Sequence, residues 1–303
     1  MSDKNLLVVV VGPTAVGKTA ATISLAKHFN GEIISSDSRQ FYKEMEIGTA
    51  KPNDEELSQV THHFVNSHSI NEDYDASTFA DDAEELLEKL FPVNNVQFMV
   101  GGSGLYIKAF CHGLDEMPEA NMLIRQTLND ELDDKGLNVL LNELRNSDPV
   151  FFEQVDRKNP QRVIRALEVI RGSGKPYSAF RLGEATRTHN FKILKIGLEM
   201  DRTVLYERID RRIDEMITLG LFEEAKKLYP HREMNALQTV GYKEIFDHLD
   251  GKYDREEAVR LLKRNSRRYA KRQLTWFRKD SEISWFTPDQ LQDIEALINQ
   301  KIV

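Results

Sequence analysis

The chemistry of this sequence begins with an eight-residue stretch near the N-terminus. Residues 12–19 read GPTAVGKT and match the pattern G-x-x-x-x-G-K-[ST], between an apolar run at 6–11 that predicts a buried strand and a helix expected over about 17–29. In this setting glycines let backbone N–H groups converge on phosphate oxygens, and the helix N-terminus adds partial positive charge. Lys18 can add a full charge, and Thr19 can offer its hydroxyl to magnesium. The stretch therefore predicts a di- or triphosphate site, with a glycine-rich turn that binds nothing as the alternative.

A carboxylate follows the second predicted strand, which covers 32–36. Open α/β sheets bind ligands at the carboxyl ends of their strands, so Asp37 is expected to face the phosphate loop as a general base or metal ligand. From its position alone, Asp37 could equally be the N-cap of a helix. A second glycine-rich turn, GGSGLY at 101–106, follows a strand predicted over 96–100. Glycine there permits close approach of a ligand or of the first loop, although ordinary tight turns use glycine too.

The composition limits the classes of protein to which the chain can belong. The chain has 303 residues, a net charge of −8 and one cysteine, Cys111, which excludes an internal disulfide and a thiolate cluster. No apolar run is long enough to span a bilayer, and the start, MSDKNLL, lacks the pattern of a signal peptide. We therefore expect a cytoplasmic protein.

One segment departs from the acidic average. Residues 260–279 contain nine lysines and arginines and no acidic residue. A basic stripe of this kind predicts contact with a polyanion, and a solvated helix face is the alternative.

The order of predicted elements indicates an α/β fold with a P-loop NTPase-like core, in which helices flank a mostly parallel sheet. We assign residues 1–118 and 189–303 to this core, which ends in basic helices. Strand-like runs disappear over 119–188, which predicts an inserted all-helical domain. Its clearest helix starts with Asn159 as N-cap and Pro160 at the first position, and we expect it to end at Gly172.

Other predicted elements complete the chain. Helices are expected over 76–91, 122–133, 137–145 and, as one long helix, 205–229, a strand over 191–198, an edge strand over 281–286, and a last helix from Thr287. In the basic helix the predicted core side is Val259, Leu262, Tyr269 and Trp276, and a four-spaced row elsewhere is Arg264, Arg268 and Arg272. Adjacent His62 and His63 would point to opposite faces of a strand, so we interpret them as structural.

The acids of the core leave several classes of protein open. A Walker-type NTPase usually places a second acid after an apolar strand, but Glu199 and Asp201, the nearest candidates, do not follow their strand cleanly. With Asp37 as the best-placed acid, the chain could be a P-loop kinase for a small metabolite or a transferase whose leaving group is diphosphate. A nucleotide-switched RNA-binding protein is the non-enzymatic alternative.

An ordered set of motifs separates these classes. The set is GPTAVGKT, DSRQFY, GTAKP, GGSGLY, NPQRVIRALEV, QTVGYKE and RRYAKRQLTWFRK. From about residue 6 to 279 the chain thereby closely resembles the tRNA dimethylallyltransferase (tRNA isopentenyltransferase) family. The resemblance implies transfer of a dimethylallyl group from dimethylallyl diphosphate to N6 of the adenine on the 3′ side of the tRNA anticodon. It also implies magnesium as cofactor and a target base flipped out of the anticodon loop.

The resemblance also implies roles for individual residues. The diphosphate would lie on Gly12, Pro13, Thr14, Ala15, Val16, Gly17, Lys18 and Thr19, with magnesium at Thr19. The catalytic residues would be Asp37 as general base, Thr19, and Arg212 at the reacting centre. The positions implied to contact tRNA are Asp37, Ser38, Arg39, Gln40, Ser103, Arg125, Gln161, Arg162, Val163, Ile164, Arg165, Thr239, Val240, Gly241, Tyr242, Lys243 and Glu244. The basic row adds Arg268 and Arg272 as contacts to the tRNA backbone.

A few positions depart from the family pattern. Ser103 replaces the usual threonine of GGTGLY but keeps its hydroxyl, Thr61 replaces a proline and Asn159 an aspartate, and 239–240 read Thr-Val for Ala-Ile. No reactive group is lost. The family's eukaryotic zinc-binding extension is absent, which implies a bacterial-type enzyme. Because one chain carries the whole set of site residues, we expect a monomer.

Overall fold

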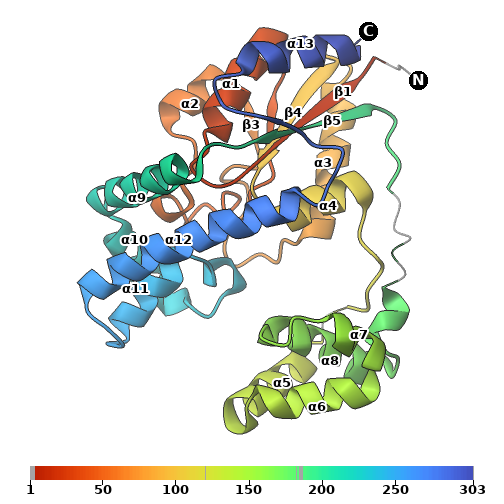
Figure 1. Cartoon of the computed structure of the whole chain (residues 1–303), viewed down its shortest axis with the longest axis vertical. Helices are drawn as coiled ribbons and strands as arrows, with labels where there is room; N and C mark the ends of the chain where they lie inside the picture. The colour runs from red at the N-terminus through yellow and green to blue at the C-terminus, as the bar shows by residue number, and fades with distance from the viewer. Residues whose placement is uncertain (1–3, 120, 182, 184–186, 303) are drawn as a thin grey trace. The chain divides into compact units, whose positions relative to one another are not determined.

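The structure is a computed structural model that describes residues 4–119, 121–181, 183 and 187–302. The chain divides into two compact units (Figure 1). The first unit comprises Met1–Cys111 and Thr188–Val303, and the second comprises His112–Arg187.

The first unit is built on a six-stranded sheet with the order β3-β2-β4-β1-β5-β6. All of its strand pairs are parallel. The strands are β1 (Leu6–Val11), β2 (Ile33–Ser35), β3 (His62–His63), β4 (Val96–Gly101), β5 (Lys192–Leu198) and β6 (Ser284–Phe286). Every residue of β1 is buried, as expected for an apolar run at the centre of a parallel sheet covered on both faces. The α/β fold class is confirmed.

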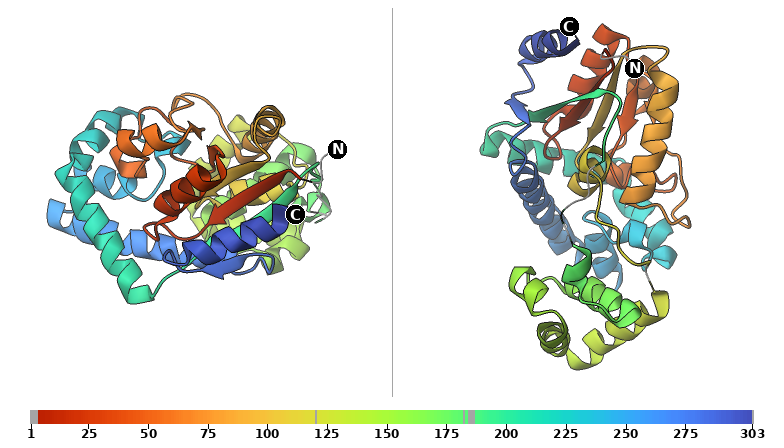
Figure 2. Two further views of the ribbon diagram at one scale, coloured as in Figure 1. Left: turned by 90° about the horizontal axis from the view of Figure 1, so that it is seen from above. Right: turned by 90° about the vertical axis from the view of Figure 1, so that its right-hand side faces the viewer.

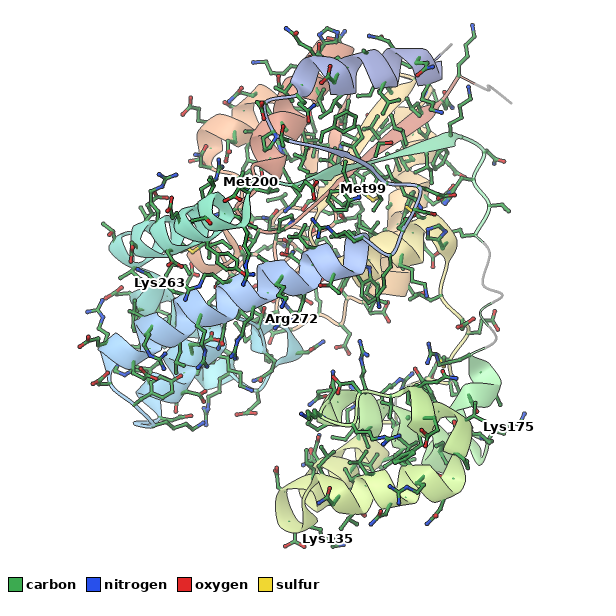
Figure 3. The ribbon with its side chains drawn as sticks, in the orientation of Figure 1. Met99, Lys135, Lys175, Met200, Lys263 and Arg272 are labelled. Carbon is green, nitrogen blue, oxygen red and sulfur yellow. The ribbon has the colours of Figure 1, made fainter. Side chains whose placement is uncertain are left out.

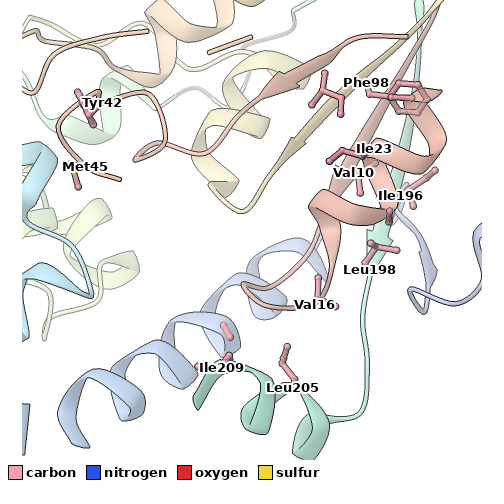
Figure 4. Packing of buried hydrophobic residues seen from close by; sticks show 14 of the residues in the cluster. Val10, Val16, Ile23, Tyr42, Met45, Phe98, Ile196, Leu198, Leu205 and Ile209 are labelled. Atoms are coloured by element: carbon pink, nitrogen blue, oxygen red, sulfur yellow. The ribbon is translucent and has the colours of Figure 1, made fainter. Parts of the chain in front are cut away.

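Helices cover both faces of this sheet. Alternate residues of β1, among them Val8 and Val10, pack in one hydrophobic cluster with α1 (Lys18–Phe29) and α13 (Leu291–Ile302). Figure 4 shows part of this cluster, with Ile23 of α1 beside Val10 and Ile196. Helix α3 (Ala76–Leu90) covers the opposite face (Figure 2).

Further helices gather near the carboxyl ends of the strands (Figure 1). They are α9 (Arg202–Thr218), α10 (Leu221–Leu228), α11 (Tyr242–Leu249) and α12 (Arg255–Phe277). Shorter elements connect the rest: η1 (Ile47–Thr49), α2 (Asp54–Gln59), α4 (Gly104–His112), η3 (Tyr229–His231) and η4 (Asn235–Leu237).

The second unit contains only helices among its described residues. They are α5 (Met122–Lys135), α6 (Leu137–Ser147), α7 (Pro149–Gln154), α8 (Pro160–Ser173) and η2 (Tyr177–Phe180). Its own hydrophobic core includes Leu128, Leu144, Phe151 and Leu167. The side chain of Asn159 accepts a hydrogen bond from the Arg162 amide, so the predicted N-cap of α8 is confirmed.

Helix ends account for three wrong predictions. The long helix expected over 205–229 is two helices, because Gly220 adopts a left-handed conformation with φ of 105° between α9 and α10. Helix α8 continues past Gly172 and ends at Gly174, which has φ of 69° and donates its amide to Ile170. The last helix begins at Leu291 rather than Thr287, because residues 287–290 form a turn closed by hydrogen bonds between Thr287 and Gln290.

The buried side of the basic helix also differs in part from the prediction. Trp276 is 39% exposed and rests against Gly104, where a Cβ atom would lie 2.3 Å from the indole. The buried residues of α12 are Ala258, Leu262, Ala270, Gln273 and Phe277. Within the part of the chain that the structure describes, no helix is both long and apolar enough to cross a membrane.

Candidate active site

Three loops meet at the carboxyl edge of the sheet because β2, β4 and β1 are neighbours in that order. The phosphate loop follows β1, Asp37 follows β2, and the GGSG turn follows β4. One cavity is lined by Lys18, Thr19, Asp37 and Gly101 from these loops, and by Arg212 from α9. The predicted catalytic residues are therefore brought together in one place.

The backbone of the phosphate loop needs glycine at its two ends. Gly12 has φ of 148°, and a Cβ there would lie 2.6 Å from the carbonyl oxygen of Leu198. Gly17 has φ of 107°, a conformation that residues with a side chain rarely adopt. Between them, Ala15 is also left-handed, with φ of 64°. The loop thus has the folded-back conformation that the sequence pattern predicts.

Lys18 turns back onto its own loop. Its ammonium donates hydrogen bonds to the carbonyl oxygens of Gly12, at 3.0 Å, and Pro13, at 2.9 Å. Burial lowers the pKa of Lys18 to about 8; Asp37 opposes this shift and Arg212 adds to it. An anion bound in the loop would give this ammonium a negatively charged partner in addition to these neutral carbonyl oxygens.

Asp37 starts a turn rather than a helix, so the N-cap alternative is wrong. Its Oδ1 accepts a hydrogen bond from the Arg39 amide at 3.0 Å, and its carbonyl accepts one from the Gln40 amide. The Asp37 carboxylate opposes the lowering of the pKa values of both Lys18 and Arg212, so its charge is felt by both cations. The carboxylate of Asp37 and the phosphate loop therefore share this cavity.

Arg212 reaches the cavity from α9. Its Nη1 lies 3.5 Å from the hydroxyl of Thr14, at the limit of a hydrogen bond. Burial lowers its pKa, and Asp37 opposes the shift. Its side chain lines the same cavity as Lys18 and Asp37.

The acids that could have completed a Walker-type magnesium site have other partners. Glu199 forms an ion pair with Arg278 at 2.8 Å. Asp201 caps α9 by accepting from the amides of Thr203 and Val204. A magnesium ion would instead find the hydroxyl of Thr19 and the carboxylate of Asp37 in the cavity, both oxygen donors of the kind it prefers, with phosphate oxygens to complete its ligands.

The residues implied to meet the target base are held firmly. The side-chain amide of Gln40 donates to the carbonyls of Thr49 and Ala50, at 3.3 and 3.2 Å, and its oxygen accepts from Ser35. The hydroxyl of Ser103 accepts from the amide of Ser38 at 2.9 Å. The GTAKP and GGSGLY motifs thus support the DSRQFY turn through specific bonds.

The segment 239–244 contributes a wall to the same cavity. Thr239, Val240 and Gly241 line it. The side chain of Tyr242 is fully buried and donates to Glu224, and that of Glu244 is 6% exposed and accepts from the Gly241 amide. Tyr242 and Glu244 therefore support the wall from behind instead of presenting side chains to a ligand.

The basic stretch 260–279, most of which lies in helix α12, is only partly neutralised. Four of the nine cations in this stretch form ion pairs with acids: Arg260 with Glu257, Lys263 with Asp214, Arg267 with Asp210, and Arg278 with Glu199. Arg268 and Arg272 are exposed, and neither takes part in an ion pair with another described residue. Figure 3 labels Lys263 and Arg272 on this helix.

The second unit presents its own cations. Arg125 and Arg165 both pair with Glu168, at 2.7 and 3.2 Å, and this carboxylate is 1% exposed. Gln161 and Arg162 are exposed on α8, whereas Val163 and Ile164 lie in the core of the unit. Of the predicted tRNA contacts in 161–165, the structure exposes Gln161 and Arg162, half-buries Arg165 and buries the apolar pair.

Four residues of α12 that were not predicted as site residues also line the cavity. They are Leu262 and Tyr269, which were assigned to the core side, together with Ser266 and Gln273. Gln273 lies on the buried side of the helix, between Ala270 and Phe277. A lone polar residue on an apolar helix face is the signal that could have revealed it.

The fold and this cavity define an α/β protein in which a phosphate-loop motif and a carboxylate line the same cavity. Residues 40–280 match the family described as IPP transferase. A curated protein called tRNA dimethylallyltransferase from Cytophaga hutchinsonii is 51% identical over 98% of this chain and 97% of its own. A second protein of that name, from Christiangramia forsetii, is also 51% identical, over 94% of each.

Solved structures agree with the sequence comparison. The tRNA isopentenylpyrophosphate transferase of Bacillus halodurans superposes with a TM-score of 0.72 at 41% identity, over 99% of this chain and 97% of that one. A eukaryotic dimethylallyltransferase described as acting on tRNA superposes with a TM-score of 0.71 at 29% identity, over 90% of this chain and 70% of that one. The chain belongs to the IPP transferase family, and it is an enzyme of the prenyltransferase class.

Proposed function

We propose that this enzyme transfers a dimethylallyl group from dimethylallyl diphosphate to N6 of the adenine on the 3′ side of the anticodon in tRNA. The observation that carries the proposal is the shared cavity of Lys18, Thr19 and Asp37. The relatives' names support a dimethylallyl group and tRNA as the reacting partners, and the cavity holds groups suited to both ends of the reaction.

The proposed reaction needs only the two substrates and Asp37 to account for its bonds and its proton. The bond between the allylic carbon and the diphosphate oxygen breaks, and its electron pair leaves with the diphosphate. The adenine N6 forms the new C–N bond, and its proton passes to the carboxylate of Asp37. General-base catalysis of this kind contributes on the order of 10²- to 10⁴-fold.

The charge on the leaving diphosphate would be met by groups that line the cavity. Phosphate-loop amides, the ammonium of Lys18 and the guanidinium of Arg212 would stabilise it. Magnesium, bound by the hydroxyl of Thr19, would add Lewis-acid stabilisation of the same oxygens.

The RNA would be bound by surfaces in each unit. On α12, Arg268 and Arg272 would contact phosphates, and in the second unit Arg125, Arg162 and Arg165 would do so. Because N6 of a stacked base cannot reach a cavity at the sheet edge, the target adenine would be flipped out of the loop. A cytoplasmic, monomeric enzyme remains the prediction.

The test uses the purified chain, dimethylallyl diphosphate, magnesium and an anticodon stem-loop RNA. The expected product is one adenosine heavier by C5H8 at the position 3′ to the anticodon, identified by mass spectrometry of the digested RNA. A matched RNA with guanosine at that position should stay unmodified. Consumption of ATP to ADP with an unmodified adenine would contradict the proposal and favour a kinase.

A further inference from the structure

Gln273 is a buried polar side chain that joins two glycine-rich turns far apart in the sequence. It lies on α12 and is 6% exposed. Its Oε1 accepts a hydrogen bond from the amide of Thr14, and its Nε2 donates one to the carbonyl of Gly102, both at 2.9 Å. One side-chain amide thus bonds the phosphate loop on one side and the turn after β4 on the other.

The packing around Gln273 explains why residue 102 is glycine. A Cβ at Gly102 would lie 2.1 Å from Nε2 of Gln273, whereas the nearest other group, the carbonyl oxygen of Gly12, would be 3.7 Å away. Gly102 is not among the described residues with positive φ, so its backbone does not require glycine. The absent side chain makes room for Gln273.

The bond to Thr14 acts on a single peptide unit. The carbonyl of Pro13 and the N–H of Thr14 belong to the same planar peptide group. Lys18 donates to that carbonyl at 2.9 Å, and Gln273 accepts from that N–H at 2.9 Å. The Pro13–Thr14 peptide is therefore held by two hydrogen bonds, one from Lys18 within the phosphate loop and one to Gln273 on α12.

We propose that Gln273 is a positioning residue that orients the Pro13–Thr14 peptide and thereby sets the affinity of the phosphate loop for a diphosphate group. The inference rests on the proposed function for the identity of the ligand. A loop fixed in its binding conformation loses less entropy when the ligand arrives, so losing this support weakens binding. Because Arg268 and Arg272 lie on the same helix, α12 serves both the RNA surface and the phosphate loop.

The first test measures the binding of inorganic diphosphate with magnesium by calorimetry. Gln273→Ala should bind about fivefold to tenfold more weakly than wild type, the loss expected for one hydrogen bond. In steady-state kinetics the KM for dimethylallyl diphosphate should rise by the same factor, while the KM for the stem-loop and kcat at saturation remain. A purely structural role would lower thermal stability without this selective change in KM.

A double-mutant cycle tests the mechanism. Gly102→Ala must displace Gln273 and should weaken diphosphate binding as Gln273→Ala does. In the Gln273→Ala background the same Gly102→Ala change should have little further effect, because the clash is gone and only an ordinary contact with Gly12 remains. The matched control is Gly104→Ala, which lies in the same turn and meets Trp276 of the same helix at 2.3 Å. This control should keep the wild-type affinity for diphosphate.

Three outcomes would overturn the inference. They are wild-type affinity in Gln273→Ala, fully additive losses in the double mutant, and a loss in Gly104→Ala equal to that in Gly102→Ala. If the wild-type chain itself binds no diphosphate, the proposed function fails and the inference fails with it.

Discussion

The amide of Ser38 donates a hydrogen bond to the hydroxyl of Ser103 over 2.9 Å. This bond joins the turn after β4 to the turn that carries Asp37. Gln273 joins the same β4 turn to the phosphate loop. Gly102 is therefore linked through Gln273 to the phosphate loop, and Ser103 is hydrogen-bonded to the Asp37 turn. The spacing between Asp37 and the phosphate loop is therefore maintained by the short turn after β4 that lies between them.

Removing the Ser103 hydroxyl should disturb the Asp37 turn. In Ser103→Ala the Ser38 amide loses its acceptor, and we expect kcat/KM for the stem-loop to fall about fivefold, which corresponds to roughly 1 kcal/mol. Ser103→Thr keeps a hydroxyl at this position and should retain wild-type kcat/KM. Steady-state kinetics with both variants measure kcat/KM for the stem-loop. An unchanged kcat/KM in Ser103→Ala would show that the bond is dispensable.

The lowered pKa of Lys18 makes ligand affinity depend on pH. The charged ammonium is the form that attracts a diphosphate, and its pKa in the free enzyme is about 8. Affinity for dimethylallyl diphosphate in the absence of RNA should therefore be nearly constant below about pH 8 and decline above it, because binding must then take up a proton.

Lys18→Arg is the matched control for this pH dependence, since an arginine stays charged throughout the range. Its affinity is expected to be weaker but independent of pH from about 7 to 9.5. Calorimetry in buffers of different ionisation enthalpy measures the proton uptake directly. Equal pH profiles for the two proteins would mean that another group titrates.

The exposed cations of α12 should act on RNA alone. Reversing both charges, in Arg268→Glu with Arg272→Glu, should weaken stem-loop binding at least about tenfold and lower its salt dependence, since two phosphate contacts are lost. Affinity for dimethylallyl diphosphate should not change. Filter binding across a salt series provides the measurement.

A double reversal of Arg260 and Arg278 is the control for net charge. Both residues lie in the same basic stretch, but each already pairs with an acid, Glu257 and Glu199 respectively. This variant should lose much less stem-loop affinity. Equal losses in the two double variants would indicate a general effect of net charge rather than contacts by Arg268 and Arg272.

Glu168 should be needed to hold two arginines of the second unit. Glu168→Gln leaves Arg125 and Arg165 without their buried carboxylate, so we expect a loss of stability of about 1–3 kcal/mol together with weaker stem-loop binding. Glu143→Gln is the control in the same unit, because Arg171 keeps its second partner, Glu131. If the two variants bind the stem-loop equally well, Glu168 has a structural role only.

Much of the core and the cavity could be predicted because local patterns encode them. The apolar run before Gly12 and the strand before Asp37 place both motifs at the same edge of a parallel sheet. Residues that act through long-range contacts left a weaker signal: Gln273 bonds to Thr14, which lies 259 positions earlier in the chain. The break at Gly220 was missed because the apolar pattern continues across it, while the backbone conformation of one glycine ends the helix.

The family resemblance predicts which motifs contact tRNA, but it does not show which residues within a motif are buried. Tyr242 belongs to the QTVGYKE motif, yet its ring packs where a Cβ at Gly48 would lie 2.5 Å away and its hydroxyl donates to Glu224. Such residues shape the cavity wall through packing, which a linear motif does not reveal.

In the proposed mechanism, Asp37 takes the proton from the adenine amine while the phosphate loop holds the leaving group. Single-turnover transfer by Asp37→Asn, with both substrates at saturating concentration, measures the contribution of this carboxylate. We expect the transfer rate to fall at least about 100-fold, while the affinities for dimethylallyl diphosphate and the stem-loop stay near wild type. A transfer rate close to that of the wild-type enzyme would show that Asp37 is not the base.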